Sequence, residues 1–130
     1  MRLPLLLLML TWALTMSAQT GAQPSWQAPA DAAARPNPIA TKPELSAGGK
    51  KIFTRSCSQC HGTGTGATRN NAPVLSSERV QQDTDGTLFW KISNGNSRTG
   101  MPSFSSLPET QRWQLVLYIR SLAQPGDQKK

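Results

Sequence analysis

Apolar residues recur with helical spacing just before the two cysteines of the chain. Positions i, i+4, i+7 and i+8 of one helical face are filled by Leu45, Gly49, Ile52 and Phe53. The segment Thr41-Lys42-Pro43-Glu44 has the order of a capping box, in which the Thr hydroxyl and the Glu carboxylate each reach a free amide of the first turn. This pattern predicts a helix that leads directly into Cys57.

A second helix is predicted between two polar stretches in the second half of the chain. It begins at Thr84 or Asp85 and ends at Asn94-Gly95, where Gly suits the left-handed position after a helix. Its apolar positions are Leu88, Phe89 and Ile92.

The third predicted helix follows another capping-box pattern, Ser106-Leu107-Pro108-Glu109. It is apolar on most of its circumference and contains Trp113, Leu115, Val116, Leu117, Tyr118, Ile119 and Leu122 before Pro125-Gly126. A helix of this kind packs against several neighbours. Because no convincing strand pattern occurs, the predicted fold class is all-α, with three main helices joined by long irregular loops.

Composition separates the compact domain, residues 42–123, from the segments beside it. Residues 23–41 are rich in Pro and Ala, and such a segment favours extended conformations and buries too little apolar surface to order itself. We therefore predict a linker there and interpret Trp26 as an isolated linker aromatic. Residues 124–130 are predicted to be a polar, basic tail.

The first residues of the chain have the order of regions of a secretory signal. One positive charge at Arg2 precedes an apolar run, and small residues follow it. Residues 1–22 are predicted to be a signal peptide that is cleaved after Ala18 or Ala22, which places the protein in the periplasm. The alternative is an uncleaved membrane anchor, although the strongly apolar part is shorter than the ~20 residues that a spanning helix needs.

The charge of the chain is basic, with a formal net value of +7. Such a charge suits nucleic acid, an anionic membrane or an acidic protein partner. Export argues against nucleic acid, and the basic residues form no dense patch. A membrane partner is expected only if the N-terminal segment is retained as an anchor.

Every cysteine and the only histidine of the chain stand together as C-S-Q-C-H, with Cys57, Cys60 and His61. A structural zinc site needs four ligands, and no further Cys or His is present. A thioredoxin-like redox pair would follow a strand, and a disulfide across so short a gap would constrain little. In covalent haem attachment, two thiols one helical turn apart reach the two vinyl groups of the porphyrin, and the next imidazole points at the iron. We favour haem, with a redox dithiol or a chance occurrence as the alternatives.

A small helical domain with long loops usually needs a cofactor or a cross-link to complete its core, and a haem would fill this need. Once the signal is removed, Met101 is the only methionine, and no second His remains. It lies in the loop Thr99-Gly100-Met101-Pro102, whose Gly allows close approach and whose Pro stiffens the chain. Met101 is predicted to be the second axial ligand, and the alternative is a gap-filling core residue.

The ordered set of motifs is similar to that of the monohaem class I c-type cytochromes. It consists of Gly49-x-x-x-Phe53, C-x-x-C-H, Pro73-x-Leu75, Gly100-Met101-Pro102 and Leu115-x-x-Tyr118. The resemblance implies a small cytochrome c-like fold in which three main helices and long loops surround one covalently bound haem c.

The resemblance also implies roles for individual residues. The helices that carry Gly49 and Leu115 should cross closely, and the Pro73 carbonyl should accept a hydrogen bond from His61. Further core or haem contacts are assigned to Leu75, Trp90, Ile92 and Phe104.

The resemblance implies a periplasmic one-electron carrier between a dehydrogenase or quinol-oxidising complex and a terminal acceptor. Its redox partners would have acidic docking surfaces, and the candidates for a basic rim that faces them are Lys50, Lys51, Arg55, Arg69 and Arg98. The alternative is that these five cations are simply solvated surface residues. The alternative function is a haem-based gas sensor with a displaceable Met101. A peroxidase is disfavoured because no second His can serve as a distal base.

Overall fold

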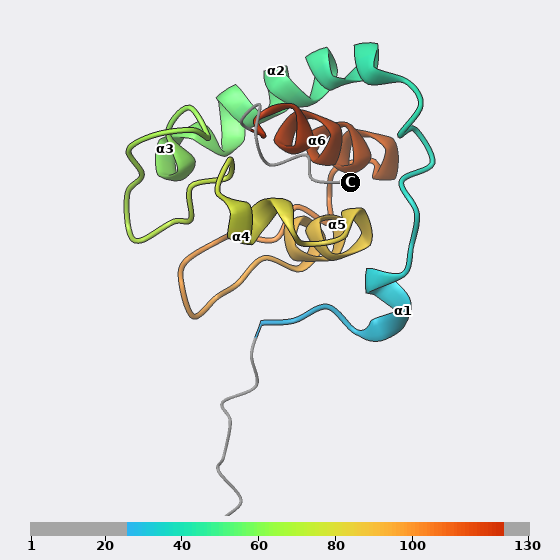
Figure 1. The fold of residues 1–130 in the computed structure, drawn as a ribbon. Coiled ribbons are helices and arrows are strands. Elements are labelled where there is room, and N and C mark those ends of the chain that lie inside the picture. Colours follow the sequence, from blue (N-terminus) through green and yellow to red (C-terminus); the bar gives the residue numbers. More distant parts are fainter. Residues whose placement is uncertain (1–25, 124–130) are drawn as a thin grey trace, which may run out of the picture.

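The computed structural model describes residues 26–123, which form helices and connecting loops (Figure 1). The elements are α1 (Ala30–Ala33), the 3-10 helix η1 (Pro43–Leu45), α2 (Ser46–Ser56), α3 (Ser58–His61), α4 (Glu78–Gln81), α5 (Asp85–Asn94) and α6 (Glu109–Ser121). The predicted all-α class is confirmed, and α2, α5 and α6 are the three main helices. The predicted signal peptide, residues 23–25 of the predicted linker and the tail 124–130 lie outside the described residues. Within residues 26–123, no helix is both long enough and apolar enough to cross a membrane.

Helices α2 and α6 pack against each other at the top of the view in Figure 1. Their backbones make close contact at Gly49. A Cβ atom built on Gly49 would lie 1.9 Å from the carbonyl oxygen of Gln114. One turn further along, the rings of Phe53 and Tyr118 meet with centroids 5.0 Å apart. The close crossing expected at Gly49 is therefore present, and it exists because the position has no side chain.

The apolar core lies where the three long helices meet. Its fully buried large side chains come from α2 and α6: Phe53, Trp113, Leu115 and Val116. Helix α5 adds Phe89, whose ring stacks on Trp113 with centroids 4.0 Å apart. Helix α6 buries part of its circumference against two neighbours, α2 and α5, which is the reason for its nearly continuous apolar sequence.

Helix α5 begins and ends where the sequence indicates. The Thr84 hydroxyl accepts a hydrogen bond from the Thr87 amide at 3.1 Å, which caps the N-terminus. At the other end Gly95 has a φ of 64°, a left-handed value that glycine adopts without a steric penalty.

Neither predicted capping box forms. The chain first makes the 3-10 turn η1, so α2 begins only at Ser46, and no side chain caps either element. Helix α6 has Pro108 at its cap position and no side-chain cap. The Glu109 carboxylate instead accepts hydrogen bonds from Arg35 at 2.8 Å and from Trp113 at 3.3 Å. The carboxylate therefore binds one side chain of its own helix and one from a distant segment, and does not cap the backbone.

Residues 26–41, which we call the N-terminal strap, lie against α5. A Cβ on Gly86 of α5 would lie 2.1 Å from the Ala32 carbonyl oxygen, so the two backbones touch. The Thr84 hydroxyl donates to the Ala33 carbonyl at 2.6 Å, and the Trp26 indole donates to the Gly95 carbonyl at 2.8 Å. The prediction that this segment does not order itself is therefore wrong for residues 26–41, because contacts with α5 supply the stability that its own composition lacks.

Candidate functional site

The C-x-x-C-H motif occupies a single helical turn. Cys57 ends α2 by donating its amide to the Phe53 carbonyl at 2.8 Å, and α3 begins with the next residue. The amides of Cys60 and His61 both return to the Cys57 carbonyl, at 3.2 and 3.0 Å. Residues three and four apart in a helical turn share one face, so both thiols and the imidazole lie on the same side of the turn.

His61 is held by the loop that follows the motif. Its Nδ1 atom lies 3.0 Å from the Pro73 carbonyl oxygen, so the Nδ1–H group donates a hydrogen bond to that oxygen. This bond leaves Nε2 as the ring nitrogen with a free lone pair, which is the tautomer that a metal ligand needs. The hydrogen bond expected from the resemblance is thus present.

Local backbone conformations bring Pro73 back to the histidine. Gly62 and Gly64 have φ values of 57° and 88°, and Asn70 and Asn71 have values of 53° and 55°. Asn is one of the few side chains that tolerates this left-handed region. The Arg69 amide then donates to the Cys60 carbonyl at 2.8 Å, which closes the loop on the motif.

Both cysteines are free thiols in the structure. Burial raises the pKa of the Cys57 thiol to about 11, and the neighbouring Cys60 adds to this shift. Redox and zinc-binding cysteines act as thiolates and normally have a lowered pKa. Among the described side chains, no group of three or more His, Cys, Asp or Glu is placed to hold a metal ion. The raised pKa of Cys57 is opposite in direction to that of a reactive dithiol.

Met101 lies in the loop that joins α5 to α6, and we call residues 95–104 the Met101 loop. Asn96 and Met101 form an isolated antiparallel bridge, with N–H···O distances of 2.8 and 3.0 Å in the two directions. Figure 1 shows this loop and α3 extending on the same side of the three long helices. Partly buried apolar side chains that pack against the core include Phe104 and Leu107 but not Met101.

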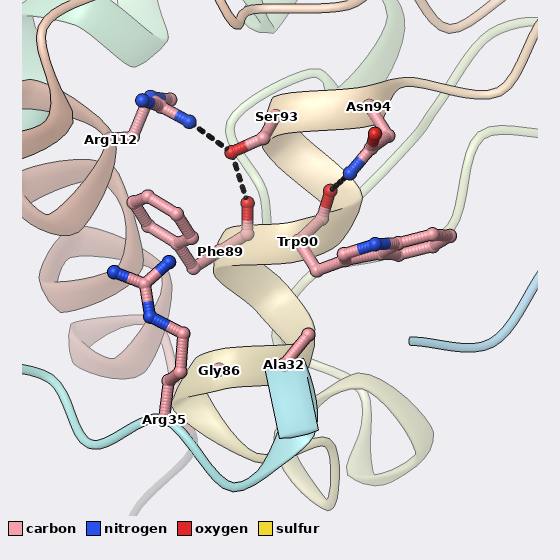
Figure 2. Close-up of a pocket in the computed structure, with 8 residues that line it drawn as sticks. All are labelled: Ala32, Arg35, Gly86, Phe89, Trp90, Ser93, Asn94 and Arg112. Carbon is pink, nitrogen blue, oxygen red and sulfur yellow. Dashed lines mark hydrogen bonds between the residues drawn. The ribbon is translucent and has the colours of Figure 1, made fainter. Parts of the chain in front are cut away.

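The remaining predicted contacts divide into two groups. Leu75 and Ile92 are buried in the core, and Phe104 packs against it and donates its amide to the Ile92 carbonyl at 3.1 Å. Trp90 instead lines a pocket of about 220 Å³ between the strap and α5 (Figure 2). Its indole points away from Arg35 and Arg112, which line the same pocket. No residue of the C-x-x-C-H motif lines this pocket, so Trp90 and the motif do not share it.

The two arginines of this pocket have structural partners. Arg35 lies over the Phe89 ring, 4.9 Å from its centroid, and pairs with Glu109. Arg112 lies 4.7 Å from the same centroid and donates to the Ser93 hydroxyl and the Leu107 carbonyl. The pocket therefore belongs to the packing of the strap.

The residues predicted to form a basic rim are exposed. These are Lys50, Lys51 and Arg55 on α2, Arg69 in the loop after the motif, and Arg98 in the Met101 loop. Arg55 stands two positions before Cys57, so it is the cation of α2 closest in sequence to the motif.

The roles of Trp26 and Arg35 were not predictable from the sequence. Both stand in a segment whose composition indicates a linker, and no periodic pattern connects them with α5. The only available signal was the presence of an aromatic and a cation between prolines, which hold the backbone extended and lower the entropy lost on docking.

Comparisons with known proteins agree with this geometry. The family model for "Cytochrome C oxidase, cbb3-type, subunit III" matches residues 44–119. The solved structure "KustC0563 c-type cytochrome" superposes with a TM-score of 0.52 at 23% sequence identity, over 58% of this chain and 98% of its own. At this identity the likeness shows a shared fold. No curated protein sequence matches the chain.

A second solved structure is similar at a lower level. It is part of the "Kuenenia stuttgartiensis reducing HAO-like protein complex Kustc0457/Kustc0458", with a TM-score of 0.49 and 23% identity. The match covers 69% of this chain and 50% of that chain, so this protein spans about half the length of that relative. This likeness carries no argument about function.

Proposed function

Because the chain belongs to the family of class I-like c-type cytochrome domains, we propose that it is a one-electron carrier between a dehydrogenase or quinol-oxidising complex and a terminal acceptor. Membership of this family implies a covalently bound haem c and a role in electron transfer. The observation that carries the proposal is the 3.0 Å contact between His61 Nδ1 and the Pro73 carbonyl, because it orients the imidazole and frees Nε2 for iron.

Each residue of the site has a distinct role in this proposal. Cys57 and Cys60 would hold a single haem through two thioether bonds, and His61 would bind its iron. Met101, presented by the bridge that it forms with Asn96, would be the other iron ligand. Leu75 and Phe104 would contact the porphyrin, and Trp90 stays outside this set.

The haem supplies a one-electron couple, and the protein limits what else can happen there. A thioether ligand favours the ferrous state and raises the reduction potential. His61 and Met101 together would keep small molecules from the iron. Such a site would transfer electrons and would not serve as a peroxidase.

We further propose that the protein is exported to the periplasm and meets acidic redox partners. The exposed cations Lys50, Lys51 and Arg55 on α2, together with Arg69 and Arg98, would steer these partners toward the motif. If the N-terminal segment is retained, the same domain would be held at the membrane.

The first experiment tests attachment. The full chain is expressed with a cytochrome c maturation system, separated on a denaturing gel and stained for haem. Stain on the wild-type polypeptide and none on a Cys57→Ala, Cys60→Ala double variant supports thioether attachment. A wild-type chain that loses its haem in the gel contradicts it.

The second experiment tests the role of Met101. Carbon monoxide should not bind the reduced wild-type protein readily, whereas Met101→Ala should bind it at once because an axial position is open. Leu107→Ala is the control, since it shortens an apolar side chain in the segment that follows the Met101 loop and keeps the sulfur. Rapid binding of carbon monoxide by the reduced wild-type protein would contradict the carrier and favour the gas sensor.

A further inference from the structure

We propose that Trp26 of the N-terminal strap is a positioning residue that holds the Met101 loop closed, an inference that rests on the proposed ligation of iron by Met101. The residue lies outside the region 44–119 that matches the family model. Its indole nitrogen donates to the Gly95 carbonyl at 2.8 Å, across 69 positions of sequence.

The effect of this bond follows from the planarity of one peptide unit. The carbonyl of Gly95 and the amide of Asn96 belong to the same rigid plane. Trp26 binds the oxygen of this plane, while the amide donates to the Met101 carbonyl at 2.8 Å. Because the two groups point in opposite directions from a trans peptide, a bond that fixes the carbonyl also fixes the amide that binds Met101.

Local sterics do not fix this plane. Gly95 has a φ of 64° and a ψ of −169°, a region that is essentially restricted to glycine. A Cβ at this position would lie 2.5 Å from the carbonyl carbon of Pro102, so another residue cannot take its place. Because glycine has no side chain to restrict its backbone angles, the peptide unit between Gly95 and Asn96 can rotate more freely than at other residues. Hydrogen bonds must therefore hold this peptide unit in place.

The position of Trp26 is itself secured from α5. The Lys91 ammonium lies 5.2 Å from the centroid of the indole and pairs with Asp83 at 2.6 Å. The Lys91 carbonyl also accepts a hydrogen bond from the Gly95 amide at 2.9 Å, so the cation and the C-terminal cap come from one residue. The ring therefore has a contact that remains when its N–H group is removed.

The test compares wild type with Trp26→Phe, which keeps an aromatic ring over Lys91 and removes the hydrogen-bond donor. Binding of imidazole to the oxidised, haem-loaded full chain requires that Met101 leave the iron, so its apparent affinity reports the fraction of open loop. Loss of one hydrogen bond should raise this affinity about five- to tenfold. The charge-transfer band of methionine-ligated ferric haem should weaken at lower imidazole concentration.

The matched control is Thr84→Val, which removes the bond from the strap to the other end of α5. This variant also removes the cap of α5, so it destabilises the protein without touching the Met101 loop. Its imidazole affinity should stay within about twofold of wild type. Denaturant unfolding followed by circular dichroism measures the stability of both variants.

Each outcome decides one statement. If Trp26→Phe binds imidazole like wild type, or if Thr84→Val raises the affinity as much, the positioning role is wrong while the carrier proposal stands. If wild-type protein lacks the methionine charge-transfer band, ligation by Met101 fails, and the positioning role fails with it.

Discussion

Gly49 of α2 lies directly against the backbone of Gln114 in α6, with no room for a side chain between them. A Cβ at this position would lie 1.9 Å from the Gln114 carbonyl oxygen and 2.5 Å from its carbon. A Cβ on the neighbouring Gly48 would meet only the end of the Gln114 side chain, with its Oε1 atom at 2.7 Å. Two adjacent glycines of one helix therefore meet a rigid obstacle and a flexible one.

Gly49→Ala should destabilise the protein by about 2–3 kcal/mol, because the strain of overpacking against backbone exceeds the gain in helix propensity. Gly48→Ala is the control, and it should be neutral or stabilise by up to about 1 kcal/mol, since the glutamine end can move aside. Denaturant unfolding of both variants measures the difference. Equal free energies of unfolding for the two variants would contradict the close crossing.

Gly86→Ala should release the N-terminal strap and leave the core folded. The added Cβ would lie 2.1 and 2.8 Å from the carbonyl oxygens of Ala32 and Ala33, which belong to the strap backbone. We expect proteinase K to cut within residues 27–41 at least about tenfold faster, while the circular dichroism spectrum stays unchanged.

The control for this change is Gly66→Ala. The nearest atom to its added Cβ would be the Thr63 hydroxyl at 4.0 Å, which is ordinary contact. This variant should be cut in the strap at the wild-type rate. If Gly86→Ala is cut in the strap as slowly as wild type and Gly66→Ala, the strap does not depend on contact with α5.

The Arg35–Glu109 pair should make a small part of the stability depend on pH. The hydrogen bond from Trp113, followed by that from Arg35, lowers the pKa of Glu109 below its usual value. A lowered pKa in the folded state stabilises the protein above the ordinary Glu range near pH ~4.3, and this stabilisation is lost as the pH falls through the lowered value. Wild type should therefore exceed Glu109→Gln in stability at neutral pH more than at pH ~3.

Denaturant unfolding at low salt measures this difference, which should be small because both side chains are exposed. In an Arg35→Gln background the pH-dependent difference should shrink but persist in part through Trp113. A difference that grows on acidification would contradict the assigned direction.

Electron transfer from the reduced protein to ferricyanide should slow as salt is added. An exposed cation near the site attracts this anionic oxidant, and Arg55 stands two positions before Cys57. Arg55→Glu should lower the rate constant about three- to fivefold at low ionic strength, measured by stopped flow. Lys42→Glu makes the same change of charge beyond the opposite end of α2, and it should have the smaller effect. Equal effects of the two variants would place the site of electron exit away from Arg55.

Local chemistry was sufficient to predict the long helices and the attachment motif. Periodic apolar positions identify α2, α5 and α6 because a helix that buries one face must repeat that face. The predicted start of α5 at Thr84 or Asp85 was correct. The helix begins at Asp85, and the capping Thr84 hydroxyl lies three residues from the amide that it binds. The capping box at Glu109 failed because its carboxylate binds Arg35, which is 74 positions away.

By itself, the sequence determined the all-α class, the three long helices and the helical turn that brings Cys57, Cys60 and His61 to one side. These features depend on residues within one or two turns of each other. Only the tertiary structure decided that the N-terminal strap packs on α5, and that Trp26 binds the peptide unit next to Met101. These contacts join segments that carry no shared pattern, and their stability comes from surfaces that exist only after α5 and its neighbours have folded.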